Sequence, residues 1–300
     1  MTTELDEFLK NITPLNREAM EAARRYQASL AKPPESLGRL EELSIQLAGI
    51  TGKLHNTMDH PHLLVFAADN GVAEEGVSSA PQSVTLMQTI NLTRAKTGAS
   101  TLCKHFGVGI TVCDVGVKAD IHEPAVLNRK IAYGTRNMAK EPAMTREQAT
   151  RAILTGIGLA MRTEASALGV GEMGIGNTTT SSAILSVLLH RPITEMTGRG
   201  AGLSSAGLQR KIDAIARAIE VNRPDANDPL DVLHKVGGFD IAGLVGVFLG
   251  GAQHHVPIVI DGVISAAAAF TAMKFCPTAA GYWIAAHVSK EPAGKIVLDA

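Results

Sequence analysis

The stretch HLLVFAADNG, residues 62–71, decides the fold class of this chain. It is a run of apolar residues that ends abruptly in an Asp-Asn-Gly turn. A short apolar run bounded by turn residues is typical of a strand that is buried on both faces, as strands are in a parallel sheet. GITVCDVGV at 109–117 and HHVPIVIDGVIS at 254–265 repeat the pattern. The chain therefore contains several buried strands that each end in a tight turn.

Segments with a helical pattern separate these strands. They cover residues 83–105, 145–168, 177–190 and 204–221. A short apolar stretch, SALGVG, precedes the third of them. Strands that alternate with helices at this spacing form βαβ units. We therefore expect an α/β protein with a doubly wound, mostly parallel sheet.

The first part of the chain has a different pattern. PLNREAMEAARRYQASLA (14–31) consists of helix formers, and RLEELSIQLAGITG (39–52) has apolar residues at helical spacing. Because these helices precede every strand, we expect residues 1–55 to form a helical cap that belongs to a small domain. Residues 56–300 would then form the α/β domain.

Composition limits the function classes. The formal net charge is −1 and no basic stripe is present, which disfavours a nucleic-acid surface. No run approaches the ~18 apolar residues of a membrane span, and the acidic start MTTELDEFLKNITPLN resembles no targeting segment. The three cysteines lie far apart in apolar surroundings, which favours buried, reduced thiols. We therefore expect a cytoplasmic protein that binds neither nucleic acid nor membrane.

Two glycine clusters point to an anion. In GEMGIGNTTTSS, residues 171–182, glycines bring backbone N–H groups close to a ligand just before a helix N-terminus, where phosphate commonly binds. The spacing fits neither the dinucleotide pattern nor a P-loop. A second cluster, TGRGAGLSSAGLQRK at 197–211, adds Arg199 and Lys211 as candidate phosphate partners. The spacing leaves open a plain strand–turn–helix in the first cluster and a surface loop in the second.

Acidic residues follow the predicted strands. They are Asp69, Asp114, Glu172 and Asp261. Ligands of open parallel sheets bind beyond the carboxyl ends of the strands. Carboxylates near a phosphate loop suit a substrate that is anionic at one end and develops positive charge at the other, as a ribosyl centre does when it loses its leaving group. Any of these acids can instead cap a helix, so the residues alone predict a phosphate-binding α/β enzyme.

Six stretches, in consistent order, resemble the nicotinate-nucleotide:dimethylbenzimidazole phosphoribosyltransferases of cobalamin biosynthesis. They are KPPESLGRLEELSIQLAG (32–49), FAADNGVAEEGVSSAPQSVT (66–85), GEMGIGNTT (171–179), GRGAGL (198–203), KVGGFDIAGLVG (235–246) and VIDGVIS (259–265). The match runs from about residue 10 to the last residue. Six stretches are far more specific than one glycine loop, so the chain is identified as a member of this family.

The resemblance implies a reaction and partners. Ribose 5-phosphate moves from nicotinate mononucleotide to 5,6-dimethylbenzimidazole or a related base, nicotinate leaves, and the anomeric carbon inverts to give an α-riboside phosphate. No cofactor and no metal are implied. Family members have a doubly wound sheet with a small helical domain and usually dimerise, so a homodimer or a heteromer with a homologous subunit is expected.

The resemblance also implies site residues. The phosphoribosyl group would be bound by Gly174, Ile175, Gly176, Asn177, Thr178, Gly200, Gly202, Lys211, Asp261 and Gly262. The incoming base would lie near Asp69, Ala80 and Gln88. The family commonly has histidine in place of Asn70 and serine in place of Ala80. Both departures affect the base pocket and leave the preferred base open.

The proton acceptor is a separate expectation. The family's general base is a glutamate on an M-R-L-G-E-G-S/T-G-A loop that follows the segment matching EPAGKIVLDA (291–300), and this chain stops at Ala300. A shortened chain with impaired activity, a homologous partner subunit, or Glu172 as a substitute base would each account for this. General-base help is typically worth about 10²–10⁴ in rate. The alternative function is a base-deficient or non-catalytic subunit that binds nucleotide and supports a catalytic homologue; the glycine spacing disfavours an NAD-dependent oxidoreductase.

Overall fold

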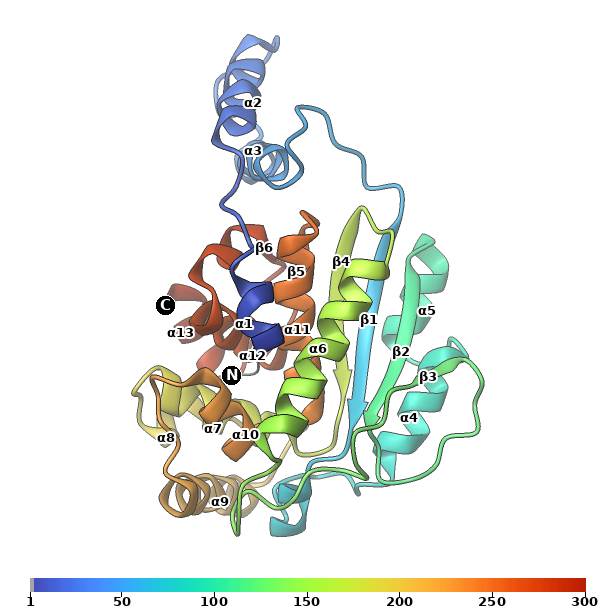
Figure 1. Ribbon diagram of the computed structural model, residues 1–300, viewed down its shortest axis with the longest axis vertical. Helices are drawn as coiled ribbons and strands as arrows, with labels where there is room; N and C mark the ends of the chain where they lie inside the picture. Colours follow the sequence, from blue (N-terminus) through green and yellow to red (C-terminus); the bar gives the residue numbers. More distant parts are fainter. Residues whose placement is uncertain (1–2) are drawn as a thin grey trace.

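The computed structural model describes residues 3–300 and contains a six-stranded, all-parallel sheet with the order β3-β2-β1-β4-β5-β6 (Figure 1). The strands are β1 Pro61–Ala68, β2 Gly109–Gly116, β3 Val126–Asn128, β4 Ala167–Met173, β5 Ile258–Ile260 and β6 Trp283–Ala285. The α/β class and the parallel sheet predicted from the sequence are therefore confirmed.

Helices make up most of the remaining chain. The helices are α1 Thr3–Leu9, α2 Arg17–Ser29, α3 Arg39–Thr51, α4 Val84–Thr93, α5 Gly98–Phe106, α6 Arg146–Arg162, α7 Asn177–Leu188, α8 Ile193–Met196, α9 Ser205–Asn222, α10 Pro229–Val236, α11 Phe239–Gln253, α12 Val263–Phe275 and α13 Ala293–Asp299, with short 3-10 helices η1 Gly71–Glu75 and η2 Pro277–Tyr282. Within residues 3–300, no helix has the length and apolar character that crossing a bilayer requires.

The sheet is covered on both faces because neighbouring side chains of a strand point to opposite sides. Phe66 of β1 packs against Gly243 of α11 on one face. The adjacent Val65 packs with Leu92 of α4 on the other. α6 lies against α11, so the first face carries two helical layers (Figure 1). The doubly wound arrangement is confirmed.

The helices α6 and α11 cross with their backbones in contact. A Cβ atom on Gly156 of α6 would lie 2.0 Å from the carbonyl oxygen of Gly243, and one on Gly246 would lie 2.0 Å from that of Ile153. A side chain here would overlap with backbone, which cannot rotate away. These glycines therefore let α6 approach α11 closely enough to complete the core over β1 and β4.

We expect Gly156→Ala to lower the free energy of unfolding by about 1–3 kcal/mol, because the added methyl group overpacks the crossing. Gly158→Ala is the matched control: it lies on the same helix, and a Cβ there meets nothing within 4 Å. This control should raise stability by about 0.5–1 kcal/mol through helix propensity. Urea denaturation measures both values, and equal effects of the two substitutions would show that the crossing tolerates a side chain.

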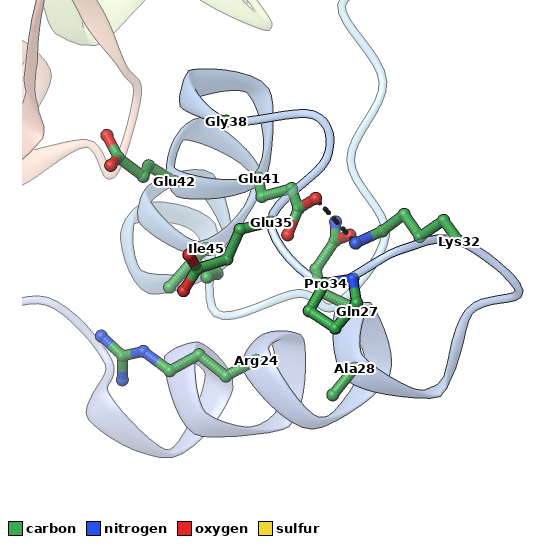
Figure 2. A pocket seen from close by; sticks show the side chains of 10 residues that line it. All are labelled: Arg24, Gln27, Ala28, Lys32, Pro34, Glu35, Gly38, Glu41, Glu42 and Ile45. Atoms are coloured by element: carbon green, nitrogen blue, oxygen red, sulfur yellow. Dashed lines mark hydrogen bonds and ion pairs between the residues drawn. The ribbon is translucent and has the colours of Figure 1, made fainter.

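The N-terminal helices predicted at 14–31 and 39–52 are confirmed as α2 and α3, which form a hairpin beyond the amino ends of the strands (Figure 1). Between them lies a hollow of about 630 Å³. An ion pair of 2.7 Å joins Lys32 and Glu41 beside it (Figure 2). Leu5 of α1, by contrast, is buried in the main core. The division of the chain at residue 55 stays a prediction.

Two predicted helix boundaries are wrong. The helix expected over 83–105 is two helices, because Ala95 adopts a left-handed φ of +52° and Thr97 then caps α5 through Ser100. The helix expected over 145–168 ends at Arg162. Residues after it extend to pair with β1 from Ala167 onward, so sheet pairing overrides the helical pattern there.

Candidate functional site

A crevice is expected where the strand order reverses. β1 lies between β2 and β4, and the chain leaves β1 toward β2 but later returns to β1's other side as β4. Loops diverge at such a switch point, and ligands of doubly wound folds bind there. The register pairs Ala67 with Met173, so the loops after β1 and β4 leave the sheet at the same level. This is where the two predicted polar segments, 69–71 and 174–178, meet.

The loop after β4 needs its two glycines for different reasons. A Cβ on Gly174 would lie 2.5 Å from the carbonyl oxygen of Ala68 and 2.4 Å from Oδ2 of Asp240. Gly176 has a φ of +99°, the left-handed region that glycine adopts without strain. The first glycine permits close contact with β1, and the second turns the chain into α7.

The N-terminus of α7 faces this crevice with unpaired donors. The N–H groups of Gly176 and Thr178 form no hydrogen bond with any residue in the described range 3–300. Since α7 is 12 residues long, its N-terminus carries the partial positive charge of a helix dipole. Free N–H groups at such a terminus make the geometry of an anion site.

Lys211 of α9 lies directly behind this loop. Its Nζ donates hydrogen bonds to Oγ1 of Thr178 at 2.8 Å and to the carbonyl oxygen of Gly198 at 3.2 Å. The side chain is fully buried, and burial lowers the pKa of Lys211 to about 8, although the Glu291 carboxylate acts in the opposite direction. Lys211 is therefore still mainly protonated at neutral pH and adds positive charge to the anion site.

A cavity of about 120 Å³ lies between the two glycine clusters. Glu172 and residues 174–178 line one side of it, and Arg199 and Ala201 line the other. The hydroxyl of Ser79 donates a hydrogen bond of 3.1 Å to the carbonyl oxygen of Ala201, so the loop after η1 also borders it. The structure thus brings together segments that are far apart in the sequence.

Two carboxylates share one amide beside this cavity. Nδ2 of Asn177 donates to Oε2 of Glu172 and, at 3.0 Å, to Oδ2 of the fully buried Asp240. Burial and the charge of Asp240 raise the pKa of Glu172 to about 7. Burial likewise raises the pKa of Asp240 to about 6. Glu172 is therefore poised to accept a proton near neutral pH.

Glu172 also borders a second, apolar space. A groove of about 380 Å³ runs along the sheet face between Leu63, Val65, Leu92 and Val259, and Glu172 and Asp261 line it as well. The carboxylate of Glu172 thus stands between a polar cavity and an apolar groove. A proton acceptor in this position can serve a reaction between an anionic substrate and an aromatic one.

Asn70 and Asp240 belong to the site although the glycine and strand-end patterns of the sequence do not mark them. Both are fully buried, and the side-chain amide of Asn70 has no hydrogen-bond partner within residues 3–300. A Cβ on Gly238 would lie 2.3 Å from Oδ1 of Asn70 and 2.5 Å from Oδ1 of Asp240, so the two side chains adjoin. In the sequence, one feature points to Asp240: it is the one charged residue in the apolar stretch 236–252.

The predicted base-pocket residues do not gather at the cavity. Asp69 is buried, and its Oδ2 accepts the N–H of Lys118 at 2.7 Å, so it holds the loop after β2. Ala80 and Gln88, both within the described range, are not among the residues that line the cavity. Their contact with a base stays a prediction.

Three other predicted residues lie around the site rather than in it. Asp261 is exposed at the end of β5, where it borders the apolar groove. Gly262 caps α12 next to it. Gly202 has a φ of +98° in open space.

Asp114 has a structural role, since its carboxylate accepts two backbone N–H groups and pairs with Lys130 at 2.9 Å.

Comparisons with known proteins agree on one family. Residues 12–300 match a family model described as phosphoribosyltransferase. The chain is 49% identical over 298 residues to a protein of Ruminiclostridium cellulolyticum, and 50% identical over 292 residues to one of Alkaliphilus metalliredigens. Both are named nicotinate-nucleotide–dimethylbenzimidazole phosphoribosyltransferase, and the alignments cover 98% and 96% of this chain and 85% and 84% of those proteins. A crystal structure of the same-named protein from Thermus thermophilus matches with a TM-score of 0.89 at 36% identity, over 95% of this chain and 86% of that one.

Proposed function

This chain belongs to the nicotinate-nucleotide–dimethylbenzimidazole phosphoribosyltransferase family, and on this premise we propose that it moves ribose 5-phosphate from nicotinate mononucleotide to 5,6-dimethylbenzimidazole or a related base. The products are nicotinate and an α-riboside phosphate. The observation that carries the proposal is the position of Glu172, between the free N–H groups of the 174–178 loop and an apolar groove.

The 5′-phosphate is proposed to bind at the N-terminus of α7. The N–H groups of Gly176 and Thr178 would donate to its oxygens, and Lys211 would supply a positive charge from behind. A hydrogen bond in which one partner is ionised is about twice as strong as a neutral one, so neutral N–H groups bind a phosphate dianion well. Arg199 lines the same cavity and adds a second cation from the other loop.

Glu172 is proposed as the proton acceptor. One azole nitrogen forms the new bond to the anomeric carbon, while the bond from that carbon to the pyridinium nitrogen of nicotinate breaks and its electron pair neutralises the ring. The second azole nitrogen gives its proton to the Glu172 carboxylate. The raised pKa of Glu172, about 7, matches this task, because a base acts best when its pKa lies near the working pH.

The carboxylates also suit the charge that develops on the ribose. When nicotinate leaves, positive charge accumulates at the anomeric carbon and ring oxygen. Glu172 and the buried Asp240, joined through Asn177, place negative charge on this side of the cavity. Such preorganised charge stabilises the transition state more than the ground state.

Turnover of nicotinate mononucleotide with 5,6-dimethylbenzimidazole tests the proposal directly. We expect the purified chain to form α-riboside phosphate, detected by mass, with nicotinate released in equal amount. Binding of the nucleotide without any product would contradict a catalytic role and would leave a nucleotide-binding subunit. A mixing experiment with a catalytic homologue would then show whether the chain supports the homologue's turnover.

Lys211→Ala is expected to weaken nucleotide binding by about 10–100-fold, because a charge-assisted hydrogen bond is worth about 1.5–3 kcal/mol. Binding of the neutral base should change little, since only the nucleotide is anionic. Arg210→Ala is the matched control, because Arg210 is an exposed cation at the neighbouring position of α9. Calorimetry with each substrate measures the affinities, and an equal loss for nucleotide and base would make Lys211 structural.

We further propose that the chain works in the cytoplasm as a homodimer or with a homologous subunit. The α2–α3 hairpin supports an assembly, because it exposes large apolar side chains, among them Leu37 and Leu40. Exposed apolar side chains that cluster on one element commonly mark a contact with another chain.

A further inference from the structure

Glu291 reaches the site from a distant part of the chain. It lies just before α13, yet its Oε1 accepts the N–H of Gly200 at 3.1 Å. A Cβ on Gly198 would lie 1.9 Å from its Oε2. The carboxylate is therefore packed directly against the second glycine cluster and holds the amide of Gly200, one of the residues expected to contact the phosphoribosyl group.

The other side of the same loop touches the phosphate site. A Cβ on Gly200 would lie 3.0 Å from Oγ1 of Thr178 and 3.7 Å from Nζ of Lys211. Lys211 itself bonds to the carbonyl oxygen of Gly198 at 3.2 Å. The loop is thus held between a carboxylate on one side and the ammonium group of the site on the other.

The charged groups around Lys211 come from three directions. Glu291 approaches from the segment before α13, and its charge raises the pKa of Lys211 against the lowering by burial. Glu172 lines the cavity from β4. Arg199 is occupied by hydrogen bonds to the carbonyl oxygen of Leu203 and the hydroxyl of Ser205. Glu291 is therefore the anion that acts on this cation from the far side of the second glycine cluster, which it contacts through the N–H of Gly200.

We propose that Glu291 is an internal competitor of the substrate phosphate: its carboxylate accepts the N–H of Gly200 beside Lys211, and a phosphate that binds there displaces it. The inference rests on the proposed function, because it takes the 174–178 loop as the phosphate site. A carboxylate and a phosphate dianion at neighbouring positions repel each other, and both can accept the N–H of Gly200 that Glu291 holds.

Such a competitor has a chemical use. The nucleotide and the riboside product carry the same 5′-phosphate, so a site that binds one tightly also retains the other. A resident carboxylate that returns to Gly200 lowers the affinity for both and helps the product to leave. Product release limits the rate of many enzymes, so this contact would set the balance between affinity and turnover.

Calorimetric titration with inorganic phosphate tests the competition. Glu291→Gln keeps a side-chain oxygen for the Gly200 N–H but removes the charge, and it should bind phosphate about 5–10-fold more tightly than the unchanged chain. Glu291→Ala removes the competing group entirely and should bind more tightly as well. Glu195→Gln is the matched control: an exposed glutamate on α8 that should leave the affinity unchanged.

The affinities of the variants for phosphate distinguish a competitor from a residue that only supports the loop. An unchanged or weaker affinity in Glu291→Gln, or a loss in Glu291→Ala, would mean that Glu291 only supports the loop and would overturn the proposal. Adding Gly176→Asp to Glu291→Gln should abolish phosphate binding; phosphate that still binds would lie elsewhere and would also overturn it. If phosphate binding is lost in Gly176→Asp but not strengthened in Glu291→Gln, the competitor role alone fails and the proposed phosphoribosyl transfer stands.

Discussion

Gly176→Asp is expected to reduce the affinity for nicotinate mononucleotide by at least about 100-fold, since a charge placed at the phosphate position removes several charge-assisted bonds at once. Gly176 precedes α7, and the N–H groups around it are those that face the cavity. An aspartate at this position caps the helix with its own carboxylate, which satisfies the donors and repels the phosphate.

Strain has to be separated from charge in this experiment. The φ of +99° at Gly176 disfavours any side chain, and a Cβ would approach that of Asn70 to 3.3 Å. Gly176→Asn provides the control, because asparagine has the shape of aspartate, tolerates left-handed φ comparatively well and carries no charge. Calorimetry should show a much smaller loss for the asparagine variant. If both variants fold and lose affinity for the nucleotide equally, the phosphate does not bind at this loop.

Glu172→Gln is expected to lower turnover by about 10²–10⁴, the range typical for loss of a general base. Glutamine keeps the size of the side chain and can still accept a hydrogen bond from Asn177, so nucleotide affinity should change far less than the rate. Glu164→Gln, an exposed glutamate in the loop between α6 and β4, is the control and should leave turnover unchanged. Single-turnover kinetics separate the chemical step from binding.

The pH profile gives an independent test of the same residue. Glu172 must be ionised to accept a proton, and its raised pKa of about 7 makes kcat/KM rise as pH increases through 7. Lys211 must be protonated to hold phosphate, and its lowered pKa of about 8 makes kcat/KM fall as pH increases beyond 8. The expected optimum therefore lies between these values. In Glu172→Gln the rise on the acidic side should disappear; if it persists, another group is the base.

Burial, and after it the charge of Asp240, explains why the pKa of Glu172 is raised to about 7. An isolated glutamate at the cavity edge would be ionised well below neutral pH. Asp240 lies behind Glu172, is fully buried, and shares the amide of Asn177 with it. Two ionised carboxylates this close repel each other, so one of them keeps its proton to a higher pH. The residue that shapes the chemistry thus need not touch the substrate.

Much of the fold follows from local patterns in the sequence. HLLVFAADNG predicts a buried strand because an apolar run without alternation must be covered on both faces, and β1 confirms it. GEMGIGN predicts a tight turn before a helix because glycine adopts backbone conformations that other residues avoid, and the close contacts at Gly174 and the φ of +99° at Gly176 confirm it. Apolar periodicity and glycine placement act within a few residues, so they can be read from the chain alone.

Only the tertiary structure decided which side chains meet. Asp240 lies 63 residues after Asn177 and Glu291 lies 91 residues after Gly200, and no local pattern predicts either contact. Asp69 follows a strand just as Glu172 lies near the end of one, yet its carboxylate turns to the N–H of Lys118. The sequence by itself determined the buried strands and the glycine turn before α7, because these follow from local free-energy preferences. The break at Ala95, the burial of Asp240 and the contacts that make the site depend on how distant elements pack.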